Sequence, residues 1–150
     1  AALDRRVFKE ARELVRQARA ALVLKPQLRG KNGELAPITA RMEQAIASSE
    51  TTPYLRANRS FHFTIYRASG SPVSVALIES LWLQISPYFN LLQDSGNYVS
   101  ANSSHRIAAE ALARGDAASA KAAIRADIDR AFEILASMLA GETPRAFTVP

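Results

Sequence analysis

The sequence predicts an all-α fold, an antiparallel bundle of about six helices, and three observations support this prediction. Ala, Leu, Arg and Glu dominate the chain, and its apolar residues recur every three or four positions. The 150 residues are 48% hydrophobic, which is enough for one core. Short segments with Gly or Pro separate the periodic runs, so successive helices should pack antiparallel. We therefore expect a single domain over residues 1–150.

The first two helices are predicted at residues 3–24 and 36–48. A loop at 27–34 separates them, because Gly30 and Gly33 allow backbone conformations that other residues avoid. Pro37 is expected near the first turn of the second helix, where its missing N–H costs nothing. The residues expected to face the core are Val7, Ala11, Leu14, Ala18, Ala21 and Leu22 in the first helix and Ile38, Met42, Ala45 and Ile46 in the second.

The third and fourth helices are marked by two Pro-containing start signals. Thr52 and Pro53 suit the N-cap and first position of the third helix, which Gly70 ends. Ser71 and Pro72 repeat the signal for the fourth, predicted at 72–93. Pro87 lies inside this fourth helix and should kink it, because proline cannot donate a helix hydrogen bond.

The last two helices are predicted at about 102–114 and 117–139. Residues 94–100 should form a loop, after which Asn102 or Ser103 caps the fifth helix. Gly115 and Asp116 supply a helix end followed at once by an N-cap. The tail at 141–150 is expected to be loose.

Four polar residues interrupt the apolar stripes that mark the core. Asn58 and His62 share one helix face with Leu55 and Ile65, and the faces of His105 and Asp127 are also apolar. Two imidazoles, a carboxylate and an amide are a suitable ligand set for one divalent ion such as Zn, Ni or Mn. The alternative is that these side chains only hydrogen-bond to one another in the core.

Two segments resemble a known family. Residues 58–72, NRSFHFTIYRASGSP, resemble the D-x-x-F-H-x-x-I…ASGN stretch of FCD domains, the effector-binding domains of FadR-type regulators in the GntR family. Residues 105–120, HRIAAEALARGDAASA, are similar to the family's H-x-x-I-x-x-A-L-x-x-G-D-x-x-x-A segment, and Glu10 to Arg12 resembles its opening E-x-R. The likeness covers nearly the whole chain.

The resemblance implies a metal held by an Asp and a His on one helix and by two further histidines. This chain departs from that pattern twice, because Asn58 replaces the family's aspartate and Asp127 its last histidine. The expected metal ligands are His62, His105 and Asp127, with Asn58 as a weaker neutral fourth.

The resemblance also implies a regulator and not an enzyme. A small organic acid is expected to bind at the metal, beside Arg12 and against the aromatic residues Trp82, Tyr88 and Phe89. We further expect a homodimer, with DNA bound through an N-terminal winged helix-turn-helix domain that these residues do not supply. Two alternatives remain open at this point, a metal-dependent hydrolase-like enzyme and a structural bundle without metal.

Composition and charge exclude further classes of protein and of binding site. The chain has no cysteine, which excludes disulfides and thiolate metal sites, and no apolar run long enough to span a membrane. A cytoplasmic location is expected. The net charge is +5, and the cations crowd the first fifth of the chain. This crowding indicates a solvated helix face, or weak contact with DNA as the alternative.

Overall fold

The structure is a computed structural model that describes residues 32–93 and 95–140. These residues form five α-helices and one 3-10 helix without any strand, which confirms the predicted all-α class. The first predicted helix, 3–24, and the tail lie outside the described residues. The elements are α2 (Asn32–Ala47), α3 (Thr51–Arg67), α4 (Pro72–Ile85), the 3-10 helix η2 (Ser86–Leu92), α5 (Asn97–Arg114) and α6 (Ala117–Leu139).

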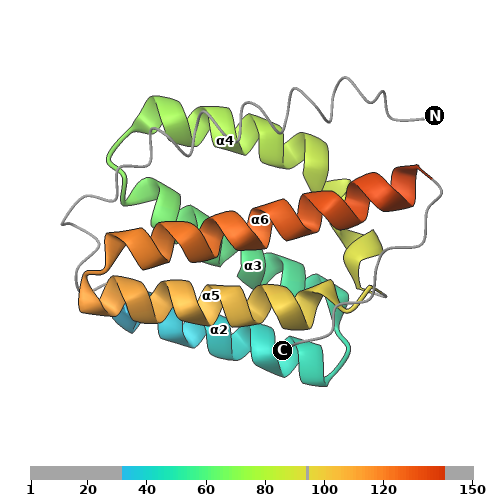
Figure 1. Ribbon diagram of the computed structural model, residues 1–150, viewed down its shortest axis with the longest axis horizontal. Coiled ribbons are helices and arrows are strands. Elements are labelled where there is room, and N and C mark those ends of the chain that lie inside the picture. Colours follow the sequence, from blue (N-terminus) through green and yellow to red (C-terminus); the bar gives the residue numbers. More distant parts are fainter. Residues whose placement is uncertain (1–31, 94, 141–150) are drawn as a thin grey trace.

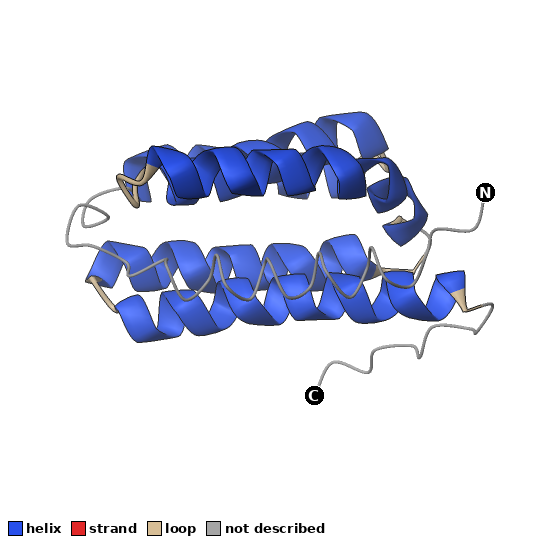
Figure 2. Ribbon diagram, turned by 90° about the horizontal axis from the view of Figure 1, so that it is seen from above, coloured by secondary structure: helices blue, strands red, loops and turns tan. Residues whose placement is uncertain are grey.

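The helices form an antiparallel bundle, as predicted. Successive α-helices run in opposite directions along the long axis, and α3 passes behind α5 and α6 in Figure 1. Seen from above, the helices form two layers (Figure 2). Helix α5 packs mainly on α6, and α2 packs on both α3 and α5. This arrangement places the inner faces of α3, α5 and α6 around one interior.

The core contains the residues that the helical periodicity predicts. Ile38, Met42 and Ala45 of α2 are buried, and Ile46 is partly buried against them. The largest side chains that are almost fully buried include one histidine. They are Phe61, Phe63, Leu35, Met42, Leu135 and His105.

Two helix starts, those of α4 and α6, match the predicted caps, and those of α3 and α5 do not. The Ser71 hydroxyl accepts a hydrogen bond from the Ser74 backbone N–H at 3.3 Å, and the Asp116 carboxylate accepts one from Ser119 at 3.0 Å. Helix α3 begins one residue before the predicted Thr52 cap. Its N-cap is Glu50, which makes no side-chain capping bond.

Two helices begin earlier than predicted, because buried side chains extend them. Helix α2 includes residues 32–34 of the predicted loop, since Leu35 must be placed in the core, where it is fully buried. Helix α5 begins at Asn97 after Gly96, which adopts a left-handed φ of 71°. Tyr98 and Ala101, predicted to lie in or next to a loop, are therefore buried helix residues, and Asn102 is not a cap.

The expected disturbance at Pro87 is present as a change of helix type. Helix α4 ends at Ile85, and residues 86–92 continue as the 3-10 helix η2 with Pro87 at its start. Proline cannot donate the next α-helical hydrogen bond, and the tighter 3-10 winding accommodates this loss. The turn brings Phe89 and Leu92 toward the interior of the bundle.

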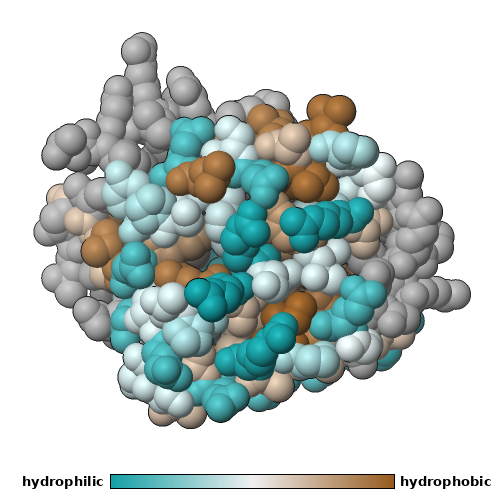
Figure 3. Space-filling model, turned by 180° about the vertical axis from the view of Figure 1, so that it is seen from behind, coloured by the Kyte–Doolittle hydropathy of each residue, from teal (hydrophilic) through white to brown (hydrophobic). Residues whose placement is uncertain are grey.

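The rear face of the bundle is mostly hydrophilic, with hydrophobic side chains in separate patches (Figure 3). The most exposed large hydrophobic side chains of the described residues are Val73 at 82%, Leu83 at 66% and Val99 at 62%. Within the described part of the chain, no helix is both long enough and apolar enough to cross a membrane.

Candidate metal centre and ligand cavity

Three of the four polar residues singled out in the sequence meet inside the bundle. His62 on α3, His105 on α5 and Asp127 on α6 have exposed fractions of 2%, 0% and 7%. The two Nε2 atoms lie 3.2 Å apart, and each lies 3.2 Å from Asp127 Oδ2. The three ligand atoms therefore form a triangle with equal sides. No other group of three or more His, Cys, Asp or Glu side chains converges in this way among the described residues.

Aromatic neighbours hold the two imidazole rings in place. The Phe61 ring packs on the His105 ring with centroids 4.7 Å apart, and the Trp82 ring lies 5.6 Å from the His62 ring. The Tyr66 hydroxyl lies one helical turn beyond His62 and contacts its Nδ1 at 3.2 Å. This contact on Nδ1 helps to hold the ring in the orientation in which Nε2 faces Asp127 and His105.

The buried environment shifts the pKa values of two cluster residues, His62 and Asp127. Burial lowers the pKa of His62, which outweighs the opposite effect of Asp127 and favours the neutral imidazole. Burial alone would raise the pKa of the Asp127 carboxyl. The contacts with His105 and His62 more than offset that effect, so the pKa of Asp127 lies well below its usual range. A neutral imidazole and an ionised carboxylate are the forms that bind metals.

The triangle fits a bound cation better than it fits a hydrogen-bond network. Asp127 is ionised and each Nε2 carries at most one hydrogen, so at most two of the three 3.2 Å contacts can be hydrogen bonds. Two ligands of a tetrahedral zinc ion, bound at about 2.0–2.1 Å, lie about 3.3 Å apart. The observed spacing is close to this value, and one cation would satisfy all three atoms.

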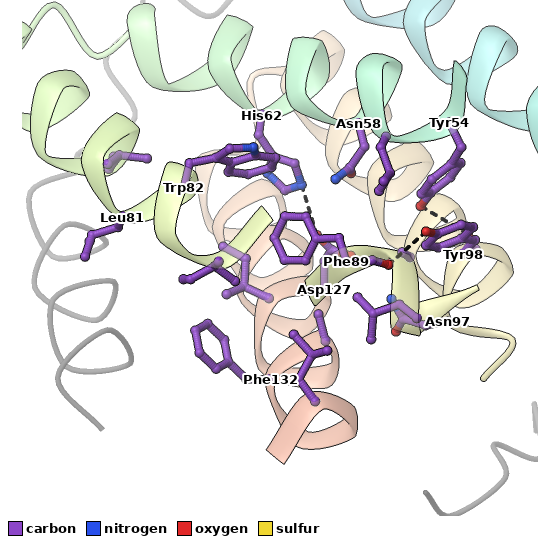
Figure 4. A pocket seen from close by; sticks show the side chains of 18 of the residues that line it. Tyr54, Asn58, His62, Leu81, Trp82, Phe89, Asn97, Tyr98, Asp127 and Phe132 are labelled. Carbon is purple, nitrogen blue, oxygen red and sulfur yellow. Dashed lines mark hydrogen bonds and ion pairs between the residues drawn. The ribbon is translucent and has the colours of Figure 1, made fainter. Parts of the chain in front are cut away.

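Two residues of the cluster, His62 and Asp127, line a partly open cavity of about 90 Å³ between α3, α4, η2, α5 and α6, and His105 lies behind this lining. Figure 4 shows the lining side chains, with His62 and Asn97 on opposite sides of Phe89. Most of the lining is aromatic or aliphatic. The polar or ionisable lining residues are Tyr54, Asn58, His62, Tyr66, Asn97, Tyr98 and Asp127, with no lysine or arginine among the described residues.

The structure places the remaining predicted site residues as follows. Asn58 is half-buried in the cavity lining, one helical turn before His62. Trp82 and Phe89 also line the cavity, whereas the half-buried Tyr88 packs against the core outside this lining. Arg12 lies outside the described residues.

Four polar lining residues, Tyr54, Tyr66, Asn97 and Tyr98, were not among the predicted site residues. Tyr66 had a usable signal, because a tyrosine four residues after His62 lies on the same helix face. Tyr54 had a similar signal, four residues before Asn58. Asn97 and Tyr98 had none, because the sequence predicts a loop at residues 94–100. The hydroxyl groups of Tyr54 and Tyr98 donate to the backbone carbonyls of Tyr98 and Phe89 at 3.4 and 2.9 Å.

An all-helical bundle with a buried histidine–carboxylate cluster beside an internal cavity defines a class of ligand-binding helical domains. Comparison with protein families gives the particular family, because the model of the FCD domain matches residues 7–130. The chain therefore belongs to the FCD domain family. Neither the curated proteins nor the solved structures that were compared gave a match. Family membership implies the effector-binding domain of a GntR-type regulator.

Proposed function

We propose that residues 1–150 form a single effector-sensing and dimerisation domain of a FadR-type transcription regulator, which binds a small organic acid at a divalent metal. The observation that carries this proposal is the triangle of His62, His105 and Asp127 beside an apolar cavity, which His62 and Asp127 line. A regulatory role agrees with the FCD family match. In this proposal DNA would be contacted by a winged-helix domain of the regulator and not by the FCD domain.

The metal would be held by His62 Nε2, His105 Nε2 and Asp127 Oδ2, with the amide of Asn58 as a fourth group. Three protein ligands are typical of sites that keep a position open for a small molecule. Two neutral imidazoles and one carboxylate leave a divalent ion with one uncompensated positive charge, which favours an anionic oxygen from the effector. When it is bound, the ion supplies the electrostatic attraction for the carboxylate of the effector.

The organic acid would lie with its carboxylate toward the cluster and its carbon skeleton against Trp82 and Phe89. Arg12 remains a candidate for a second contact to the carboxylate, because a guanidinium can grip it through two parallel hydrogen bonds. Binding at the junction of α3, η2, α5 and α6 would couple the effector to the relative positions of these elements.

Metal analysis of the purified chain tests the proposal. Wild-type protein incubated with Zn²⁺, Ni²⁺ or Mn²⁺ and then desalted should retain about one ion per chain, and its melting temperature should rise because only the folded state holds the site. His62→Ala and Asp127→Asn should lose both the ion and the temperature shift. Asp129→Asn is the matched control, because this carboxylate is also on α6 but pairs with Arg125 at the surface.

A chain that stays free of metal in excess ion, with an unchanged melting temperature, would contradict the metal site. The proposed homodimer is tested separately by sedimentation of the same protein at micromolar concentration. A single monomeric species would contradict the dimerisation role.

A further inference from the structure

The amide of Asn97 is the strongest feature of the cavity that the proposed metal site does not use. Asn97 is the first residue of α5, lines the cavity and has an exposed fraction of 5%. Its Oδ1 is completely buried and has no hydrogen-bond partner among the described residues. A buried polar atom without a partner destabilises the folded state, so a ligand that supplies a partner would gain affinity.

The other polar groups near this end of the cavity are already occupied. The Tyr54 hydroxyl donates to the Tyr98 carbonyl, and the Tyr98 hydroxyl donates to the Phe89 carbonyl. Burial, with smaller effects of Asp127 and Tyr98, raises the pKa of Tyr54 well above its usual range, so this hydroxyl remains neutral. Asn97 is therefore the lining group that would bind a polar substituent of the ligand at this end.

A hydroxyl group is the substituent that suits Asn97. It can donate to the amide oxygen, and it can also accept from the amide N–H₂, so it satisfies this side chain in either orientation of the amide. A carboxylate can only accept. Because the described lining holds no lysine or arginine, a second carboxylate would be buried without a compensating charge.

The size of the cavity limits the carbon skeleton. Its volume is about 90 Å³. An apolar protein cavity that encloses benzene has a volume of roughly 150 Å³, so an aromatic ring or a long acyl chain would extend beyond this space through its open side. A short aliphatic chain matches the volume better.

We propose that the ligand is a short-chain aliphatic monocarboxylate that carries a hydroxyl group away from its carboxylate, and that Asn97 selects it by binding this hydroxyl. The inference rests on the proposed function, because the carboxylate is placed at the metal cluster. Asn97 is the specificity-determining residue of the cavity, and Figure 4 shows it apart from His62.

Three four-carbon acids that differ only at the distal carbon test this inference. Butyrate, 4-hydroxybutyrate and succinate end in a methyl, a hydroxymethyl and a carboxylate group. Calorimetric titration of the full chain, loaded with Zn²⁺, should show 4-hydroxybutyrate binding about three- to tenfold more tightly than butyrate, the range that one neutral hydrogen bond supports. Succinate should bind at least about tenfold more weakly than 4-hydroxybutyrate, because its second charge is unpaired.

The variant Asn97→Leu keeps the size of the side chain and removes the amide, so it should bind butyrate and 4-hydroxybutyrate equally. Asn102→Leu is the matched control. Asn102 is also on α5, is also buried and also has an Oδ1 without a partner among the described residues, but it does not line the cavity. This variant should keep the preference for the hydroxyl group. If the leucine variant does not fold, Asn97→Ser, which keeps a small polar group, should reduce the preference.

Equal binding of butyrate and 4-hydroxybutyrate by the wild type would overturn the role of Asn97 and leave the metal site standing. If Asn97→Leu still binds 4-hydroxybutyrate more tightly than butyrate, the role of Asn97 is also overturned and the metal site still stands. If Zn²⁺ binds and none of the three acids does, the acid effector and this inference both fail. Failure of Zn²⁺ itself to bind would instead contradict the metal site of the proposed function.

Discussion

Tyr66 positions His62, because its hydroxyl contacts the ring nitrogen that faces away from the cluster at 3.2 Å. Partners of this kind orient metal-binding histidines, and their removal lowers metal affinity about 10- to 100-fold. We expect Tyr66→Phe to weaken Zn²⁺ binding by that factor in a competition with a chromophoric chelator. Tyr54→Phe is the control, because the Tyr54 hydroxyl bonds a backbone carbonyl instead. Equal affinities of the two variants would show that Tyr66 does not position the ring.

The metal-free protein should lose stability as the pH falls from neutral. The pKa of His62 is lowered by burial, so below pH 6.5 the unfolded state takes up this proton before the folded state does. Stability that is present above pH 6.5 is therefore lost as the pH falls toward the folded pKa of His62. Asp127 acts in the same direction in more acidic solution, because its pKa is also lowered.

Thermal melts in a chelator, recorded between pH 8 and pH 5, measure this slope. His62→Gln is the control, because it has no proton to gain at that position and should give a flatter profile. A wild-type melting temperature that rises on acidification would contradict the assigned charge states.

The sequence could predict these residues only because polar side chains interrupt apolar stripes. His62, His105 and Asp127 could be assigned to inward helix faces from spacing alone, and the structure places all three in the interior. Their 3.2 Å triangle could not be predicted, since it depends on how α3, α5 and α6 are rotated against one another. Asn97 gave no signal, because its own segment was assigned to a loop.

At the scale of the elements, two glycines should respond in opposite directions to the same substitution. Neither Gly33 nor Gly96 has an atom within 4 Å of an added Cβ, so no clash distinguishes them. Gly33 lies in the first turn of α2, where alanine restricts the unfolded chain, and Gly33→Ala should stabilise the protein by about 0.5 kcal/mol. Gly96 has a φ of 71°, so Gly96→Ala should destabilise it by about 1–2 kcal/mol.

Urea unfolding of both variants beside the wild type measures these changes. Shifts of the same sign would contradict the assignment of Gly96 as the residue that permits the turn into α5.

This turn also explains why the sequence does not predict the start of α5. A glycine beside asparagine and serine is typical of a loop, and only the burial of Tyr98 and Ala101 shows that the helix begins directly after it.

At the scale of the whole molecule, the antiparallel order of the helices creates the site. The three cluster residues are separated by 43 positions between His62 and His105 and by 22 between His105 and Asp127. Their helices nevertheless meet because α5 packs on α6 and the two enclose the interior with α3. The cavity and the cluster therefore depend on the folded bundle, and a ligand at either one should stabilise the same arrangement.

The last prediction follows from this shared arrangement. If an acid binds through its carboxylate to the metal, the metal must raise the affinity for the acid, and the acid must raise the affinity for the metal by the same factor. For a coupling of about 1–3 kcal/mol this factor is roughly 5- to 150-fold. Titrations of 4-hydroxybutyrate with and without Zn²⁺, and of Zn²⁺ with and without the acid, measure both sides. The two factors should agree within error and both should fall to one in Asp127→Asn. An acid that binds equally well in the presence of chelator would place its carboxylate away from the His62, His105 and Asp127 cluster, even if the cluster holds an ion.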